Sequence, residues 1–525
     1  MSLGTGRWQQ HAVIGGAGAL FVIIALLPLV CPLFGLLNQG PRDLLQGLEV
    51  FASSRPWVLL ANSLGLSGAV VVGALTLGTP MGILLARTDV IGRRVMLLVH
   101  GFPMFLPPFL LALGWFYLFG RQGTLGGETS ASLLFHPLGQ VAVLSLAFTP
   151  VVTALIALGL WNLDPSLEEA ARVTARPFRV AVGILLPAAW PSIVLGAILV
   201  FALSFSELGV PMFLRVDVYP AAIFSRLSGI NYDPGEAFLL ALPLVLMALM
   251  LVTAERRLFK NRSFDFFGIQ HRERELLPLG RWRCVLSIVV LGLTLFSLFP
   301  IIALSVKAWT GGGLLLAGQW LGGSLLNSLL GAGFAATMIV GIGAVIGHAR
   351  ARELRGSRFL DFVGVLAFVT PAALLGIGII ALWNRPSTNF LYAGIGVIVI
   401  GYVARYGIIG IRTTAVAVAQ SRLSLEQAAA TAGAGFTRRL VSIVLPMHRR
   451  TLAAAWILAA VFCLRDLETA VLYYPPDWQP LTVRIFTLEA NGPEAVIAGL
   501  ATVQVAITMA LLGVGVLILK KGSER

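Results

Sequence analysis

The sequence predicts an all-α polytopic membrane protein of about twelve transmembrane helices, arranged as two parallel six-helix repeats. Hydrophobic residues make up 57% of the 525-residue chain and charged residues only 12%, with a mean hydropathy of +0.88. A soluble fold of this length could not cover so much apolar surface. Two further observations support the prediction. The apolar residues gather in long segments, and polar landmarks of the first half return in the second.

The apolar segments are long enough to span a membrane. A hydrocarbon core of about 30 Å takes roughly 20 helical residues to cross. We expect six spans in the first half, at about 11–37, 58–86, 95–119, 138–162, 188–213 and 237–254. We expect six more in the second half, at about 284–307, 325–349, 359–382, 389–411, 448–470 and 493–519. The predicted domains are residues 1–254 and 284–525, joined by a polar cytoplasmic linker at 255–283.

The basic residues orient these spans. With the N-terminus in the cytoplasm, the cytoplasmic segments hold 28 of the 38 Lys and Arg residues, and the opposite loops hold seven. Cytoplasmic loops of membrane proteins carry such an excess. It accounts for the net charge of +14 without nucleic-acid binding. We therefore expect both termini in the cytoplasm.

Short motifs recur at a nearly constant spacing. Asn62-Ser63-Leu64 begins the second span, and Asn327-Ser328-Leu329 begins the eighth, 265 residues later. Residues 107–114 match residues 371–378 at a spacing of 264, with a proline at the start and a glycine at the end of each. Because each half has an even number of spans, the repeats share one orientation. Their pseudo-twofold axis should stand along the membrane normal.

A polar, alanine-rich stretch follows the fourth span of each half, on the predicted cytoplasmic side. The first copy contains Glu168, Glu169, Ala170, Ala171, Ala175 and Pro187, and the second contains Glu426, Gln427, Ala428, Ala429, Gly433 and Pro446. Ser166 with Glu169, and Ser424 with Gln427, fit the capping-box pattern that starts a helix. A polar helical segment repeated once per half suggests a part that two identical partners grip.

This stretch resembles the EAA loop of permease subunits in binding-protein-dependent ABC importers. That signature is Glu-Ala-Ala, three residues and Gly, then an apolar residue and Leu-Pro about a dozen positions later. The first copy has Ala175 in place of the glycine and lacks one residue before Pro187. The second has Gln427 in place of the glutamate but keeps Gly433 and the full spacing to Pro446. The copies depart from the pattern differently, which suggests two unequal docking sites.

The resemblance implies two fused permease domains that cover nearly the whole chain, similar to ferric-iron and thiamine importers and, more distantly, to spermidine/putrescine permeases. Each EAA loop would then fold as a coupling helix on one subunit of an ABC ATPase homodimer. An extracytoplasmic substrate-binding protein would deliver the cargo, ferric iron or a thiamine-like substrate, to a bacterial plasma (inner) membrane.

The resemblance also implies that this chain is not an enzyme and carries no cofactor. It has no G-x-x-x-x-G-K-[ST] phosphate loop, so ATP and magnesium are expected on the partner ATPase.

A major-facilitator secondary transporter, driven by an ion gradient, is the alternative. That family also has six plus six spans in parallel repeats, and residues 89–94 resemble the end of its loop motif. However, Leu85 stands where that motif has a glycine, and the equivalent loop of the second half, 352–358, fits a generic basic loop better. Gly-Arg-Arg after a span is also an ordinary element of a cytoplasmic loop.

Among the ionisable residues within or at the edge of predicted spans, where charge is costly to bury, five are candidate residues of the translocation path. They are Glu207, Arg405, Arg465, Asp466 and Glu468. Glu207 and Asp466 occupy matching places, 259 residues apart. These residues either line the translocation path or form structural ion pairs, and the sequence leaves both interpretations open. The six histidines and three cysteines show no metal-ligand spacing, so no metal site is expected.

Overall fold

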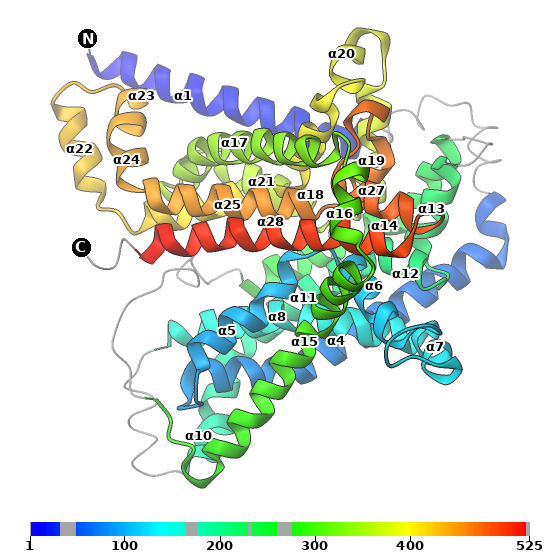
Figure 1. Ribbon diagram of the computed structural model, residues 1–525. Helices are drawn as coiled ribbons and strands as arrows, with labels where there is room; N and C mark the ends of the chain where they lie inside the picture. The colour runs from blue at the N-terminus through cyan, green and yellow to red at the C-terminus, as the bar shows by residue number, and fades with distance from the viewer. Residues whose placement is uncertain (1, 32–48, 164–175, 229–233, 260–275, 521–525) are drawn as a thin grey trace.

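The chain folds into helices. The computed structural model describes residues 2–31, 49–163, 176–228, 234–259 and 276–520. Among these residues the one β-type contact is an isolated parallel bridge between Thr88 and Leu277. The predicted all-α class is therefore confirmed. Figure 1 shows two bundles of long helices, one formed mainly by each half of the chain.

The helices occur in the predicted order. The first half contains α1 (Ser2–Phe21), η1 (Val22–Leu26), η2 (Glu49–Ala52), α4 (Ser54–Arg87), α5 (Arg93–Gly101), η3 (Phe102–Phe105), α6 (Pro108–Phe119), α7 (Glu128–Leu134), α8 (Pro137–Trp161), α10 (Pro177–Val180), η4 (Ala181–Leu185), α11 (Leu186–Ser206), α12 (Gly209–Phe213), α13 (Tyr219–Ser228) and α14 (Pro234–Phe259). The second half contains η6 (Gly280–Trp282), α15 (Arg283–Thr310), α16 (Gly313–Trp320), α17 (Ser324–Ala351), α18 (Ser357–Val369), α19 (Ala372–Trp383), η7 (Pro386–Thr388), α20 (Asn389–Tyr392), α21 (Ile395–Ala419), α22 (Leu423–Thr431), α23 (Phe436–Arg439), η8 (Leu440–Val444), α24 (Leu445–Met447), α25 (Arg449–Arg465), α26 (Ala470–Tyr473), η9 (Pro476–Trp478), α27 (Leu481–Glu489) and α28 (Glu494–Lys520).

The number of spans agrees with the prediction. In the described part of the chain, nine helices could cross a membrane, or twelve if each of three bent helix pairs is one span. The pairs bend by 101° before α6, by 110° before α19 and by 81° before α25. The first two bends occur at the repeat-related prolines Pro107 and Pro371. Proline lacks a backbone N–H and disfavours helical geometry in the residue before it, so one helix ends there and another begins.

The predicted boundaries of three spans are wrong. α11 ends at Ser206 and α25 ends at Arg465, whereas the apolar runs predicted spans at 188–213 and 448–470. The residue after each helix is acidic and has extended backbone, and its carboxylate caps the next short helix, so the long helix cannot continue. The tenth span lies at Ile395–Ala419, about two turns later than predicted.

The first long helix of each half packs against the helices of the other half. α1 packs along α17 and η1 reaches α18 and α21, whereas α15 packs against α5 and α6 (Figure 1). Gly114 and Gly378 permit this contact. A Cβ on Gly114 would collide with the carbonyl oxygen of Pro300, and one on Gly378 with that of Pro28. Small residues let membrane helices approach closely, so the exchange explains why these glycines recur at a spacing of 264.

We expect Gly378→Ala to destabilise the protein by about 1–3 kcal/mol, because the added methyl group has no space against the backbone at Pro28. The measurement is the melting temperature of the detergent-solubilised protein. Gly341→Ala is the matched control, since a Cβ there meets nothing within 4 Å. An unchanged melting temperature for Gly378→Ala would contradict the exchange of first helices.

Candidate functional site

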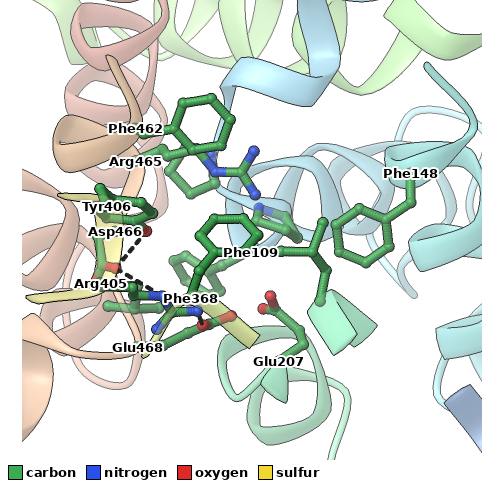
Figure 2. A pocket seen from close by; sticks show the side chains of 14 residues that line it. Phe109, Phe148, Glu207, Phe368, Arg405, Tyr406, Phe462, Arg465, Asp466 and Glu468 are labelled. Atoms are coloured by element: carbon green, nitrogen blue, oxygen red, sulfur yellow. Dashed lines mark hydrogen bonds and ion pairs between the residues drawn. The ribbon is translucent and has the colours of Figure 1, made fainter. Parts of the chain in front are cut away.

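A small charged pocket lies where the broken helices of the two halves meet. Its volume is about 30 Å³, room for roughly one or two water molecules. All five predicted intramembrane ionisable residues line it. The full lining is Pro107, Pro108, Phe109, Phe148, Leu203, Glu207, Phe368, Arg405, Tyr406, Phe462, Arg465, Asp466, Leu467 and Glu468 (Figure 2).

The two helix breaks place repeat-related carboxylates in the pocket. Glu207 follows α11, and its Oε1 accepts a hydrogen bond of 3.2 Å from the backbone N–H of Val210 in α12. Asp466 follows α25, and its Oδ1 accepts from the N–H groups of Thr469 and Ala470 at 2.9 and 3.3 Å. Carboxylates at such positions satisfy N–H groups that a helix start leaves unpaired. Both residues therefore have a structural role, in the same local geometry.

Arg405 neutralises the second-half carboxylates. Its guanidinium forms an ion pair with Glu468, and its Nε lies 3.7 Å from Oδ2 of Asp466. The Tyr406 hydroxyl donates to the same Asp466 oxygen at 2.6 Å. Buried ion pairs of this kind lower the cost of holding charge away from water. Arg405, Asp466 and Glu468 thus form ion pairs with one another, and a role in the translocation path stays a prediction.

Within the described part of the chain, two ionisable groups of the pocket form no ion pair. Arg465 donates to the carbonyl oxygen of Met104 and lies 5.4 Å from the Phe462 ring centroid. Glu207 has no cationic group within 4 Å among the described residues, and its carboxyl group points into the pocket opposite Glu468 (Figure 2). A further donor, Nη1 of Arg405, is buried without a hydrogen-bond partner in the described part. The pocket thus offers both acidic and basic groups to a polar ligand.

The second copy of the repeated stretch forms a helical hairpin at the end of the molecule where α1 begins and α28 ends (Figure 1). Gly433, between α22 and α23, has φ +85°, a left-handed conformation that glycine adopts without strain. Gln427 and Ala428 are exposed, Ala429 is half-buried and Pro446 is exposed. The predicted capping box at Ser424 is wrong: α22 begins at Leu423, and no side chain caps it.

Glu426 anchors α22 to the end of α17. Its carboxylate accepts from Arg352 Nη2 at 2.6 Å and lies 2.8 Å from His348 Nε2. Burial by itself raises the pKa of Glu426, but the hydrogen bonds and charges of His348 and Arg352 outweigh it and lower the pKa to about 2. Glu426 therefore faces its own chain, and Gln427 is the residue that faces outward.

Both copies end in the same local structure. In each, a five-residue π-helix, η4 or η8, precedes Leu-Pro, with Pro187 in α11 and Pro446 in α24. Proline cannot donate the usual hydrogen bond four residues back, so the preceding turn is irregular. Pro187 is exposed, as Pro446 is. Glu168, Glu169, Ala170, Ala171 and Ala175 lie outside the described residues.

Comparison with known proteins identifies the family. Residues 78–254 match the family described as binding-protein-dependent transport system inner membrane component. The ferric transport system permease protein FbpB of Actinobacillus pleuropneumoniae is 24% identical over 488 residues, 86% of this chain and 70% of that protein. A second relative, the protein named FbpB 1 of Haemophilus influenzae, is 25% identical over 466 residues, 82% of this chain and 72% of its own. This chain is a permease component of a binding-protein-dependent ABC transporter.

A shorter relative matches only part of the permease. The molybdenum transport system permease protein ModB of Escherichia coli K12 is 27% identical over 210 residues, which cover 38% of the permease and 92% of ModB. These relatives place the permease among multi-pass inner-membrane proteins and favour the ABC interpretation over the major-facilitator alternative.

Sequence reasoning missed three residues that hold these sites together. His348 and Arg352 bind Glu426, and Tyr406 binds Asp466. The spacing of His348 and Arg352 was the available signal, since residues four apart at the end of a helix lie on one face. Tyr406 follows Arg405 directly, but nothing in its sequence neighbourhood indicates a carboxylate partner.

We expect Glu426→Gln to lower the melting temperature of the permease at neutral pH. The folded-state pKa of about 2 lies below the unfolded value of about 4.3, so the stabilisation is complete above about pH 4.3 and is lost as the pH falls toward 2. The difference in melting temperature between variant and wild type should therefore shrink below about pH 4.

Glu353→Gln is the control, because the Glu353–Arg358 pair is 3.6 Å long with both side chains at least 70% exposed, and such pairs contribute little. A difference for Glu426→Gln that stayed constant from pH 7 to pH 3 would count against the anchor.

Proposed function

We propose that this permease imports ferric iron, driven by a separate homodimer of ABC ATPases and supplied by an extracytoplasmic substrate-binding protein. The observation that carries the proposal is the similarity to two FbpB proteins, which covers 86% and 82% of the chain. The name of the first relative states ferric transport, and no relative reported above is named for thiamine. Ferric iron is therefore the preferred cargo.

The coupling surface of the proposal is the exposed face of α22. Glu426 is turned inward by Arg352 and His348, which leaves Gln427 and Ala428 free to meet a partner. Alanine allows close approach of another backbone. The first EAA loop, with Glu168 and Glu169, would supply the second contact. Two loops about a pseudo-twofold axis match a homodimer of ATPases.

The proposed orientation of the permease rests on the same surface. The end that carries α22 is also the end where α1 begins and α28 ends (Figure 1), so an ATPase bound there places both termini in the cytoplasm. The excess of Lys and Arg in the segments at this end supports that orientation. We further propose two permease units, 1–254 and 284–525, joined by the linker 255–283.

The charged pocket is the proposed translocation path. A volume of about 30 Å³ does not admit a hydrated ion, so the described conformation is closed at this point. In the described residues, no three His, Cys, Asp or Glu side chains are arranged to hold a metal ion. The pocket holds acidic and basic side chains together, so it would contact a passing cargo ion without holding it tightly, as conduction requires.

The proposal is tested with the permease–ATPase complex in lipid nanodiscs. ATP hydrolysis is measured with a purified substrate-binding protein, loaded with ferric iron or empty. Stimulation by the iron-loaded form supports iron import, and stimulation only by a thiamine-loaded protein would refute the cargo. Uptake without any ATPase, driven by a proton gradient, would refute the mechanism.

We expect Ala428→Trp to uncouple the transporter, because a bulky side chain on the exposed face of α22 blocks close docking of the ATPase. The readouts are the amount of ATPase that copurifies and the rate of uptake, and both should fall. Leu315→Trp, at an exposed position of α16, is the control and should change neither. Normal uptake by Ala428→Trp in a stable complex would contradict the role of α22.

We expect Glu207→Gln to lower uptake about tenfold, a barrier change of roughly 1.4 kcal/mol, with little change in melting temperature. The amide oxygen can still accept from Val210, so the helix cap survives while the ionisable carboxyl group is lost. Glu494→Gln, in the more exposed Lys307–Glu494 pair, serves as the control. A variant that melts earlier but transports normally per folded molecule would show that Glu207 is structural only.

A further inference from the structure

The serine of the repeated Asn-Ser motif makes the same hydrogen bond in both halves, whereas the asparagine does not. Oγ of Ser63 accepts from the N–H of Tyr219 at 2.8 Å, and Oγ of Ser328 accepts from the N–H of Leu481 at 2.7 Å. Each serine thus holds the start of a helix, α13 or α27, against the start of a long span.

The asparagines differ in their partners. The side-chain amide of Asn327 donates to the carbonyl oxygens of Asp477 and Gln479, at 3.0 and 3.4 Å. Asn62 is exposed and its side chain has no hydrogen-bond partner in the described part of the chain. It lines an open pocket of about 420 Å³, together with Leu66, Phe135, Pro137, Arg215 and Asp217. The site that a peptide segment fills in one half is open in the other.

Loop length explains the difference. Leu481 comes 15 residues after Asp466, whereas Tyr219 comes only 12 residues after Glu207. The three additional residues of the second half form part of a loop containing η9, which brings its carbonyl groups to Asn327. The shorter loop of the first half passes through Arg215 with φ +56°, an uncommon conformation for a residue with a side chain, and stops short of Asn62.

We propose that the Asn62 pocket receives an exposed loop of the substrate-binding protein. The pocket lies among α4, α7 and α8, at the end of the molecule opposite α22 (Figure 1), which is the outer face in the orientation proposed above. Asn62 donates to backbone carbonyl groups of that loop, as Asn327 does within its own chain. Arg215, exposed at the rim, pairs with an acidic side chain of the loop. The inference rests on the proposed function.

The chemistry of the pocket favours a peptide over a free anion. Asp217 stands beside Arg215 in the lining, so the local charge is balanced. The apolar side chains of Leu66, Phe135 and Pro137 offer a surface for the flank of a loop. The Asp477–Gln479 segment in the second half shows the kind of ligand that this asparagine position binds.

A pocket that is open in only one half would determine the orientation of the substrate-binding protein on the permease. Because the permease is pseudo-symmetric, two orientations of the binding protein related by the pseudo-twofold axis would otherwise make similar contacts. Because the equivalent position in the second half is filled by its own loop, only the first half accepts the ligand. The lobe of the binding protein that carries the acidic loop therefore stands over the first half.

The test measures the Kd of a purified substrate-binding protein for the permease–ATPase complex in nanodiscs. Asn62→Leu combined with Arg215→Gly should weaken binding at least tenfold, with the melting temperature preserved because glycine tolerates the backbone of residue 215. Arg55→Gln, at an exposed arginine near the start of α4, should change the Kd less than twofold. A double variant that binds like wild type would overturn the proposal.

A photo-crosslinking residue at position 62 provides an independent readout. An adduct with the binding protein supports the proposal, and adducts found only within the permease or with a second permease copy overturn it. The wild-type complex separates this test from the proposed function. If the binding protein does not stimulate its ATPase at all, the importer assignment fails. If stimulation is normal but the double variant binds fully, only the pocket assignment fails.

Discussion

The structure depends on hydrogen bonds and ion pairs that stabilise acidic side chains in an apolar environment. Glu207 and Asp466 each stand after a helix that ends inside the predicted spans, and each carboxylate caps the next short helix. Each helix ends where it does because the carboxyl group that follows it hydrogen-bonds to the start of the next short helix. These buried groups are stable away from water because backbone N–H groups, and in the second half also Arg405, bind them. Both halves use this arrangement, so the two sets of charges meet at one pocket between them.

The elements around the pocket connect it to the coupling surface. α22 is fixed to α17 by Glu426, and the chain then runs through α23, η8 and α24 into α25, whose last residue, Arg465, lines the pocket. The exchanged first helices pack against the broken spans at Gly114 and Gly378. We infer that a shift of α22 moves the end of α25, while the exchanged helices keep the halves together as the pocket opens.

The sequence predicted the fold class, the number of spans and the five charged residues that share the pocket, because apolar segments and buried charges leave strong signals. It failed where tertiary contacts decide. The apolar runs continue past Glu207 and Asp466, so the capped breaks could not be seen. The exchange of first helices is a long-range contact without a periodic signal. Whether Glu426 or Gln427 faces outward depends on His348 and Arg352, which lie on another helix.

We infer that this pocket is closed in the described conformation and opens during transport. The most direct measurement is hydroxyl-radical labelling of Tyr406, which is buried in the pocket, in the nucleotide-free complex and in the complex trapped with ATP and vanadate. Labelling of Tyr406 should rise several-fold in the trapped state, while labelling of Tyr219, buried in the first half, stays constant. Equal labelling of Tyr406 in both states would show that the pocket does not open during transport.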